Sequence, residues 1–315
     1  MSKKPFSKFT RSLAKIILPL LFKILIKLKI NRRVINYLNE KSYFSNNIHN
    51  FNMIIKDLLK DKKIISLDVG AQGGFNSDNF FHKRYEPFFE DILLEPIKSE
   101  FEKMPKKKYS ICKGLWSSKK VKDLYILDNR LGSSSMYKIE NKNFDLHNIK
   151  KKNYDDFKIT RTIQVECDTL ENVLTELNIE SLDYLKIDTQ GAEFEILQGL
   201  GKYRPLLIKV EAHIFSMYRD VPSWNNLINN LYKLNYVTVD WKEIGSHSTR
   251  VPAEMDMIFI QNFNNDEGKK IILNSKEKFI SLMLIFGQLS LLKVIMQRLG
   301  LDYEKLKPFE DKYFN

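Results

Sequence analysis

The chain has 315 residues, 43% of them hydrophobic, which is enough for a substantial core and excludes a disordered tail. Its net charge of +12 would suit a nucleic acid or a membrane, but residues 1–33 carry ten lysines and arginines and no acid, leaving 41 of the 51 basic residues against 39 acids. Two cysteines exclude a disulfide framework and fall short of a structural zinc site, so a reducing cytosol is the simplest setting.

The first zone, residues 1–62, is predicted to be a basic amphipathic helical region. Its apolar runs at 16–22 and 24–26 are far shorter than the ~18 to 20 residues of a spanning helix. More cations follow them, where a signal peptide would have a small-residue cleavage site. Cations that alternate with Ile, Leu and Phe are typical of helices on anionic membranes, so residues 1–33 either contact a membrane surface or pack on the domain. A second amphipathic helix is predicted at 50–59.

The middle zone, residues 63–263, alternates short apolar runs with helical ones, which is typical of βαβ units around a mostly parallel sheet. The last two runs leave no room for a crossover helix, so the final strand is predicted to be antiparallel. Residues 114–182 are predicted to be an inserted lid or substrate region with extra strands at 121–127 and 162–165. Residues 264–315 form a helical extension. The predicted strands are 63–69, 91–95, 109–113, 183–188, 206–211, 236–241 and 255–261.

The strand at 63–69 runs into a glycine turn, Asp68-x-Gly70-x-x-x-Gly74, and then into a predicted helix. The spacing is neither that of dinucleotide enzymes nor that of a P-loop, so pyrophosphate binding is disfavoured. A carboxylate at a strand end suits a cationic amino group, such as that of S-adenosylmethionine. Glu95 follows Gly74 by 21 residues, the distance at which an acid reaches ribose hydroxyls in a doubly wound sheet. The turn and Glu95 together predict a nucleoside pocket, although an ordinary tight turn is the alternative for a lone glycine pair.

Five sequence blocks follow one another between residues 68 and 211. They are Asp68-Val-Gly-Ala-Gln-Gly-Gly74, Glu95-Pro96, Thr169-Leu-Glu171, Leu185-Lys-Ile-Asp188-Thr-Gln-Gly191-Ala-Glu193-Phe-Glu-Ile-Leu-Gln-Gly199 and Val210-Glu211. With these blocks, residues about 64–261 resemble the FkbM family of S-adenosylmethionine-dependent methyltransferases. The resemblance implies an α/β fold of the class I methyltransferase type, with a Rossmann-like, seven-stranded, mostly parallel sheet. It also implies an EC 2.1.1 enzyme with S-adenosyl-L-methionine as cofactor. The cofactor residues that it implies are Asp68, Gly70, Gln72, Gly74, Glu95 and Pro96.

Three residues depart from the family pattern. Gln72 replaces Asn, Glu171 replaces Asp, and Gln190 replaces the Glu commonly found before Gly191. The first two are mild changes. Gln190 removes a negative charge beside Asp188, which can alter the choice of acceptor.

Methyl transfer from a sulfonium needs mainly position and orientation, but a sugar hydroxyl also benefits from a base. Asp188 and His213, at the ends of the fourth and fifth core strands, are the catalytic candidates. Their alternatives are a cap for a helix at 190–200 and a structural histidine. No dense carboxylate motif demands Mg²⁺, so the enzyme is predicted to need no metal. The candidates for substrate binding are Ser133, Ser134, Gln190, Glu193 and Glu211.

A nucleic-acid methyltransferase would share this cofactor pocket. It would be expected to show an Asn/Asp-Pro-Pro-aromatic or Pro-Cys motif and a basic surface, so no nucleic acid is expected as partner. A non-catalytic, membrane-associated protein that retains the fold is the other alternative. By family analogy, the acceptor is predicted to be a sugar hydroxyl of a surface polysaccharide, a lipid-linked glycan or a related small molecule. The predicted location is cytoplasmic, with residues 1–33 able to bring the enzyme to the inner face of the plasma membrane.

Overall fold

The computed structural model describes residues 50–78, 80–244 and 252–309, together with seven residues near the N-terminus. The chain divides into two units, Met1–His49 and Asn50–Asn315, and the helix predicted at 50–59 lies in the second one. The prediction for residues 1–33 falls almost entirely outside the described residues. Among the described residues, no helix is both long enough and apolar enough to cross a bilayer.

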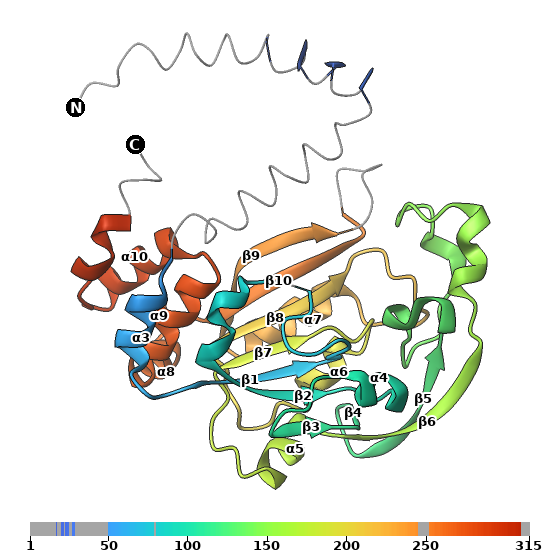
Figure 1. Cartoon of the computed structure of the whole chain (residues 1–315), viewed down its shortest axis with the longest axis horizontal. Helices are drawn as coiled ribbons and strands as arrows, with labels where there is room; N and C mark the ends of the chain where they lie inside the picture. Colours follow the sequence, from blue (N-terminus) through green and yellow to red (C-terminus); the bar gives the residue numbers. More distant parts are fainter. Residues whose placement is uncertain are drawn as a thin grey trace. The chain divides into compact units, whose positions relative to one another are not determined.

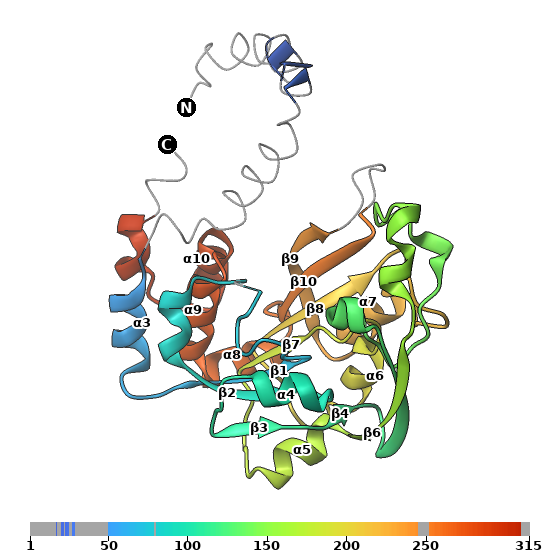
Figure 2. The same cartoon turned by 45° about the vertical axis from the view of Figure 1, so that its right-hand side comes forward.

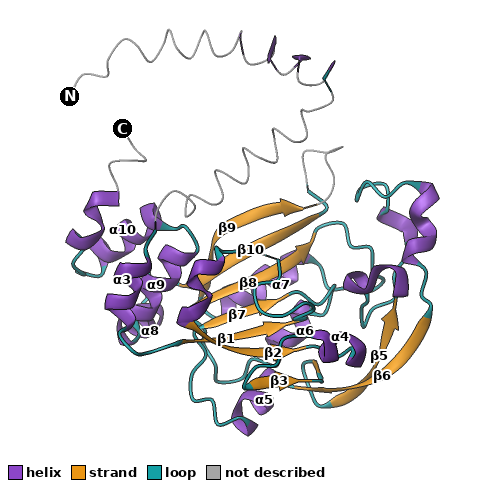
Figure 3. Ribbon diagram, in the orientation of Figure 1, coloured by secondary structure: helices purple, strands orange, loops and turns teal. Residues whose placement is uncertain are grey.

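The second unit is built on a seven-stranded sheet in the order β3-β2-β1-β7-β8-β10-β9 (Figures 1 and 3). β10 runs antiparallel to both its neighbours, β8 and β9, whereas the pairings along the rest of the sheet are parallel. The mostly parallel sheet and its antiparallel final strand are therefore as predicted. The strands are β1 (Ile64–Val69), β2 (Phe89–Leu94), β3 (Tyr109–Ile111), β7 (Tyr184–Ile187), β8 (Leu207–His213), β9 (Tyr236–Ile244) and β10 (Glu254–Gln261).

The insertion forms a second sheet, with strand order β4-β6-β5, that contains both of the extra strands predicted there. Its strands are β4 (Gly114–Leu115), β5 (Lys120–Ile126) and β6 (Arg161–Asp168). Figure 2 shows this sheet at one end of the unit and the helices α3, α9 and α10 together at the other. The 3₁₀ helices η3 (Asp128–Ser133), η4 (Asn141–Asn143) and η5 (Lys151–Phe157) lie between β5 and β6.

Helices surround the main sheet. Within the helical extension predicted at 264–315, Gly287, with φ +73°, separates α9 from α10. The α-helices are α3 (Asn52–Leu59), α4 (Lys98–Lys103), α5 (Leu170–Glu176), α6 (Glu193–Gln198), α7 (Trp224–Lys233), α8 (Asp266–Asn274), α9 (Lys276–Ile285) and α10 (Leu289–Arg298), and the remaining 3₁₀ helices are η2 (Lys83–Phe88) and η6 (Glu304–Leu306).

The α-helix predicted directly after the glycine turn is wrong. The first helical element described after β1 is the 3₁₀ helix η2. Gly73, Gly74 and Asn76 have φ values of +82°, +96° and +54°, which a right-handed helix does not allow. The Asn76 side chain instead bonds the backbone of Phe81, donating to its O at 2.9 Å and accepting from its N at 3.3 Å, so the segment forms a compact loop.

The two faces of the main sheet differ in composition because successive residues of a strand point to opposite faces. On the first, here called the apolar face, Leu67, Leu185 and Ile208 join one hydrophobic core with residues of α5, α6, α7 and the second sheet. On the second, here called the ionic face, Asp68 pairs in register with Lys186, and Lys186 with Lys209. The same strands therefore carry a core on one side and a row of buried charges on the other.

Candidate active site

A cavity of about 640 Å³, its open mouth included, lies at the carboxyl ends of β1, β2 and β7, where ligands of open α/β sheets bind. Residues of the insertion close it from the other side. The predicted site residues that line it are Gly70, Gln72, Glu95, Pro96, Ser134, Asp188 and Gln190, whereas Asp68, Gly74, Ser133, Glu193, Glu211 and His213 do not.

Gly70 makes the closest backbone contact at this edge of the sheet. Its φ is +79°, and a Cβ added there would lie 2.0 Å from the carbonyl oxygen of Asp188. Only glycine lets the turn after β1 pass the end of β7 so closely. The requirement for Gly70 is therefore steric as well as conformational.

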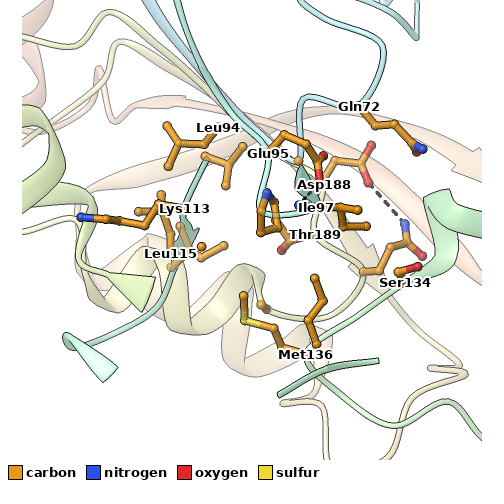
Figure 4. A pocket seen from close by; sticks show the side chains of 18 of the residues that line it. Gln72, Leu94, Glu95, Ile97, Lys113, Leu115, Ser134, Met136, Asp188 and Thr189 are labelled. Carbon is orange, nitrogen blue, oxygen red and sulfur yellow. Dashed lines mark hydrogen bonds between the residues drawn. The ribbon is translucent and has the colours of Figure 1, made fainter. Parts of the chain in front are cut away.

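Glu95 places a buried carboxylate on the cavity wall (Figure 4). The residue is 4% exposed, and its Oε1 accepts a hydrogen bond from the backbone N of Ile97 at 2.8 Å. Burial raises the pKa of Glu95 to about 7, despite that hydrogen bond. The contact of Glu95 with ribose hydroxyls stays a prediction, and the structure places the carboxylate on the wall of the cavity.

The wall beside Glu95 is largely apolar. Figure 4 shows Leu94 and Leu115 on one side of the cavity, away from Gln72 and Ser134 on the other. An apolar wall with a few polar groups is typical of a small-molecule site and suits a flat aromatic ring such as adenine. The insertion supplies Leu115, Leu124, Leu131 and Met136 to this wall, residues that the sequence analysis did not identify.

Asp188 and Gln190 form the polar end of the cavity. The Asp188 side chain is 31% exposed, and Gln190 Nε2 donates to Asp188 Oδ1 at 3.3 Å and to Glu211 Oε2 at 2.8 Å. Gln190 is held in turn, because its Oε1 accepts from the Tyr218 hydroxyl at 2.8 Å and its backbone O accepts from Ser135 Oγ at 2.7 Å. Gln190 therefore links the cavity to buried carboxylates behind it.

The alternative reading of Asp188 as a helix cap is wrong. Helix α6 begins at Glu193, and its N-cap, Ala192, makes no side-chain cap bond. Glu193 reaches back instead, and its Oε1 accepts from Thr189 N at 2.9 Å, Thr189 Oγ1 at 3.0 Å and Gly191 N at 3.1 Å. Glu193 is thus a buried support for the 189–191 loop, and Asp188 remains open to the cavity.

Asp68 lies behind the cavity wall, on the ionic face. It is 1% exposed, and its Oδ1 is 3.2 Å from Lys186 Nζ, without the geometry of a hydrogen bond. Burial raises the pKa of Asp68, although Lys186 acts in the opposite direction. The predicted direct contact of Asp68 with the cofactor stays a prediction, since its partner in the structure is Lys186.

The row of charges continues across the sheet. Lys209 Nζ lies 2.9 Å from both Asp78 Oδ2 and Asp256 Oδ1, and Lys186 lies 3.8 Å from Asp78 and 4.0 Å from Asp188. Although burial opposes it, the carboxylates around Lys186 raise its pKa. Both lysines are therefore held as cations beneath the cavity.

Glu211, His213 and Glu254 form a second buried group on the ionic face, next to the cavity. Their donor atoms all lie within 4.8 Å of one another, and this is the group of described residues that could hold a metal ion. Burial raises the pKa of Glu211 well above its ordinary value. Burial lowers the pKa of His213, but the bond to Glu254 and the surrounding carboxylates outweigh it and raise that pKa.

Glu254 and Asp256 were not predicted as site residues, although their sequence pattern indicates a polar face. In β8 and β10 a charged or polar residue stands at every second position, in Lys209-Val-Glu-Ala-His213 and Glu254-Met-Asp256. Such alternation in buried strands indicates a polar face rather than a second apolar one. Tyr218, whose hydroxyl donates to Gln190, carried no comparable signal.

The fold, its strand order and the cavity at the strand ends define a class I methyltransferase. The profile of the methyltransferase FkbM domain matches residues 68–238, more than half of the chain, and the chain belongs to this family. The predicted resemblance is thereby confirmed, and with it an EC 2.1.1 methyltransferase that uses S-adenosylmethionine as methyl donor. No curated protein matches the chain.

Proposed function

We propose that this methyltransferase acts on a hydroxyl group, with a sugar of a surface polysaccharide, a lipid-linked glycan or a related small molecule as acceptor. The observation that carries the proposal is the open carboxylate of Asp188 at the polar end of the cavity, oriented by Gln190. Hydroxyl groups donate hydrogen bonds to carboxylates, and a nearby carboxylate can take their proton. Asp188 is therefore the proposed proton acceptor.

The residues that line the cavity suit different parts of the cofactor. Glu95 would accept hydrogen bonds from the ribose hydroxyls, and Leu94 and Leu115 would pack against adenine. Gly70 lets the turn after β1 lie against the end of β7, so the backbone of both strands reaches the cavity wall. S-adenosylmethionine, when bound, supplies an electrophilic methyl group, so the protein itself has to provide orientation and a proton acceptor.

His213 is a less suitable base than Asp188. It does not line the cavity, it is 6% exposed, and its Nδ1 lies 3.2 Å from Glu254 Oε1. Its catalytic role stays a prediction. Nor does the cavity support a nucleic-acid acceptor, because among the described residues that line it Lys113 is the sole cation.

Calorimetry with S-adenosylhomocysteine, the demethylated product, tests the cofactor site. Glu95→Ala should weaken binding at least tenfold, because it removes the carboxylate from the ribose end. Glu102→Ala is the matched control, since Glu102 is an exposed acid on α4. Equal affinity of all three proteins would refute the proposed ribose contact.

Mass spectrometry of glycans tests the acceptor. Cells that lack the enzyme should lose a methyl group from one class of glycan, and wild-type protein should restore it. Asp188→Asn should bind S-adenosylhomocysteine but fail to restore the mark, because the amide cannot accept the proton. An unchanged glycan profile in cells that lack the enzyme would exclude this acceptor class.

We also propose that residues 1–33 associate with an anionic membrane surface. The described helical residues Ile17, Leu20, Leu21 and Ile24 follow the spacing of one helix face and are 43–57% exposed. Lys23 and Lys27 lie among them. Apolar and cationic side chains in this arrangement favour the surface of an anionic bilayer. Flotation on phosphatidylserine vesicles should recover the full chain but not a chain that starts at residue 34, and equal recovery would exclude the association.

A further inference from the structure

We propose that Glu211, His213 and Glu254 form a binding site for a divalent transition-metal ion, separate from the cofactor cavity. The three residues come from two neighbouring strands. His213 and Glu254 are directly opposite each other in the antiparallel pairing of β8 with β10, and Glu211 precedes His213 by two residues on the same face. The register of the sheet, rather than a flexible loop, therefore brings the three side chains together.

The orientation of the imidazole is that of a metal ligand. His213 Nδ1 lies 3.2 Å from Glu254 Oε1, whereas Nε2 is buried, has no hydrogen-bond partner and lies 3.7 Å from Glu211 Oε2. A histidine that binds a metal through one nitrogen commonly donates the other N–H to a carboxylate. Two donors that each lie about 2.1 Å from one ion are roughly 3.0 to 3.4 Å apart, so a small inward shift would suffice to bind an ion.

The charges around the group also favour a cation. Glu211 and Glu254 are 7% and 8% exposed, and among the described residues their cationic partners within 4 Å are histidines. The nearby lysines of the ionic face are engaged elsewhere, Lys186 by Asp68 and Lys209 by Asp78 and Asp256. Two buried carboxylates whose cationic partners are histidines lack a permanent counter-charge, and a divalent ion would supply one.

The donor set indicates the class of ion. An imidazole nitrogen beside a carboxylate suits Mn²⁺, Fe²⁺ or Zn²⁺, whereas Mg²⁺ and Ca²⁺ prefer ligand sets made of oxygen. The inference departs from the metal independence predicted from the sequence. It does not depend on the identity of the methyl acceptor, and it makes His213 a ligand rather than a base.

The site lies one side chain away from the cofactor cavity. Gln190 Nε2 donates to both Glu211 and Asp188, so an ion that draws the Glu211 carboxylate inward acts on the group that orients Asp188. The glutamine is suited to this position, since a glutamate there would add a third carboxylate beside Asp188 and Glu211. The metal site would thus support the polar end of the cavity from behind.

Mn²⁺ titration of the full-length protein, after dialysis against a chelator, tests the site. Free Mn²⁺ gives an electron paramagnetic resonance signal, and we expect one equivalent to be bound with a dissociation constant well below 1 mM. Mn²⁺ should also raise the melting temperature of the protein. Glu211→Gln and His213→Gln should each weaken binding more than tenfold. His82→Gln, which changes a histidine away from the site, should bind as the wild type does.

The wild-type titration decides the matter even if a variant fails to fold. No binding of Mn²⁺ or of Zn²⁺ by wild-type protein up to about 1 mM would overturn the proposal, as would binding that both substitutions leave unchanged. Binding of S-adenosylhomocysteine by the same samples reports separately on the cofactor site. A protein that binds this nucleoside but no metal would therefore refute the metal site alone.

Discussion

The two faces of the main sheet are built from the same strands but stabilise the protein in different ways. Leu185 on the apolar face is fully buried among aliphatic side chains, whereas its neighbour Lys186 is 4% exposed among carboxylates. Burial of Leu185 is favourable in itself, while burial of Lys186 is tolerated only because its partners are in place. One face of the sheet therefore contributes stability through apolar burial, and the other holds charged groups in fixed positions.

The position of the charges explains why this cost is tolerated. The ionic face ends at Asp188, Glu211 and His213, where the strands meet the cavity. Charges held by strand register need little reorganisation when a ligand binds, and such preorganised groups are the usual source of catalytic electrostatics. Because successive side chains of a strand point to opposite faces, the residues of the hydrophobic core lie on one face and the charged residues near the cavity lie on the other.

Lys186→Met gives the sharpest test of the ionic face and the largest expected effect. It leaves Asp68 buried without its partner, so the free energy of unfolding should fall by about 3 to 5 kcal/mol in urea denaturation. Adding Asp68→Asn should recover part of the loss, because the uncompensated charge is then removed. Lys108→Met, which breaks an exposed pair with Glu90, is the control and should leave the midpoint unchanged. If Lys186→Met lowered the free energy of unfolding as little as this control does, the ion pair of Lys186 with Asp68 would contribute nothing to stability.

Leu185→Ala tests the apolar face at the adjacent position. It should lower the free energy of unfolding by about 3 kcal/mol through lost burial and the cavity left behind. The affinity of the folded protein for S-adenosylhomocysteine should not change, because Leu185 does not line the cofactor cavity. A measurable loss of affinity by calorimetry would contradict the separation of the two faces.

Much of this architecture could be predicted from the sequence. The strands were visible because buried parallel strands are short apolar runs, and the antiparallel β10 followed from the short connection before it. The loop after Gly70 was mispredicted as a helix, since the positive φ of Asn76 depends on its side-chain bonds to Phe81, which no local pattern reveals. Local periodicity therefore identified the elements but not the special turn between them.

The candidate site was predictable to a smaller extent. Glu95 and Asp188 were found because both stand at strand ends within family motifs, and both line the cavity. Glu254 was missed because its closeness to His213 arises from pairing between strands 41 residues apart. A contact set by register across a sheet becomes visible only once the strand order is known.

Gly70→Ala tests the edge of the main sheet that borders the cofactor cavity. The added Cβ would lie 2.0 Å from the carbonyl oxygen of Asp188, so the turn must shift. We expect a loss of stability of at least about 2 kcal/mol and at least a tenfold loss in affinity for S-adenosylhomocysteine. Gly300→Ala is the matched control, because Gly300 also has a positive φ, +65°, but nothing within 4 Å of an added Cβ. This control should cost about 1 kcal/mol, and equal losses in the two variants would show that close packing at Gly70 is unimportant.

Glu95→Gln has the smallest expected effect on stability, and its sign is opposite to that of the others. The pKa of Glu95 is raised from 4.5 to about 7, so between these pH values the folded state binds more protons than the unfolded state. Wild-type stability should therefore fall as the pH rises through this window, and glutamine should remove that part of the fall. At pH 8 we expect Glu95→Gln to be more stable than wild type by about 1 to 2 kcal/mol. Water that reaches the cavity keeps this gain below the value that the full pKa shift would give. At pH 4 the two proteins should be equally stable.

Chemical denaturation at several pH values measures this gain, and Glu102→Gln makes the same charge change at an exposed position as a control. The same Glu95→Gln protein should bind S-adenosylhomocysteine more weakly, because the amide is a poorer acceptor for the ribose hydroxyls than a carboxylate. A gain in stability with a loss of affinity would show that this carboxylate is kept for the ligand rather than for the fold. If stability at pH 8 fell instead, Glu95 would belong with the residues that hold the sheet together, and the division between stabilising and functional groups would have to be drawn elsewhere.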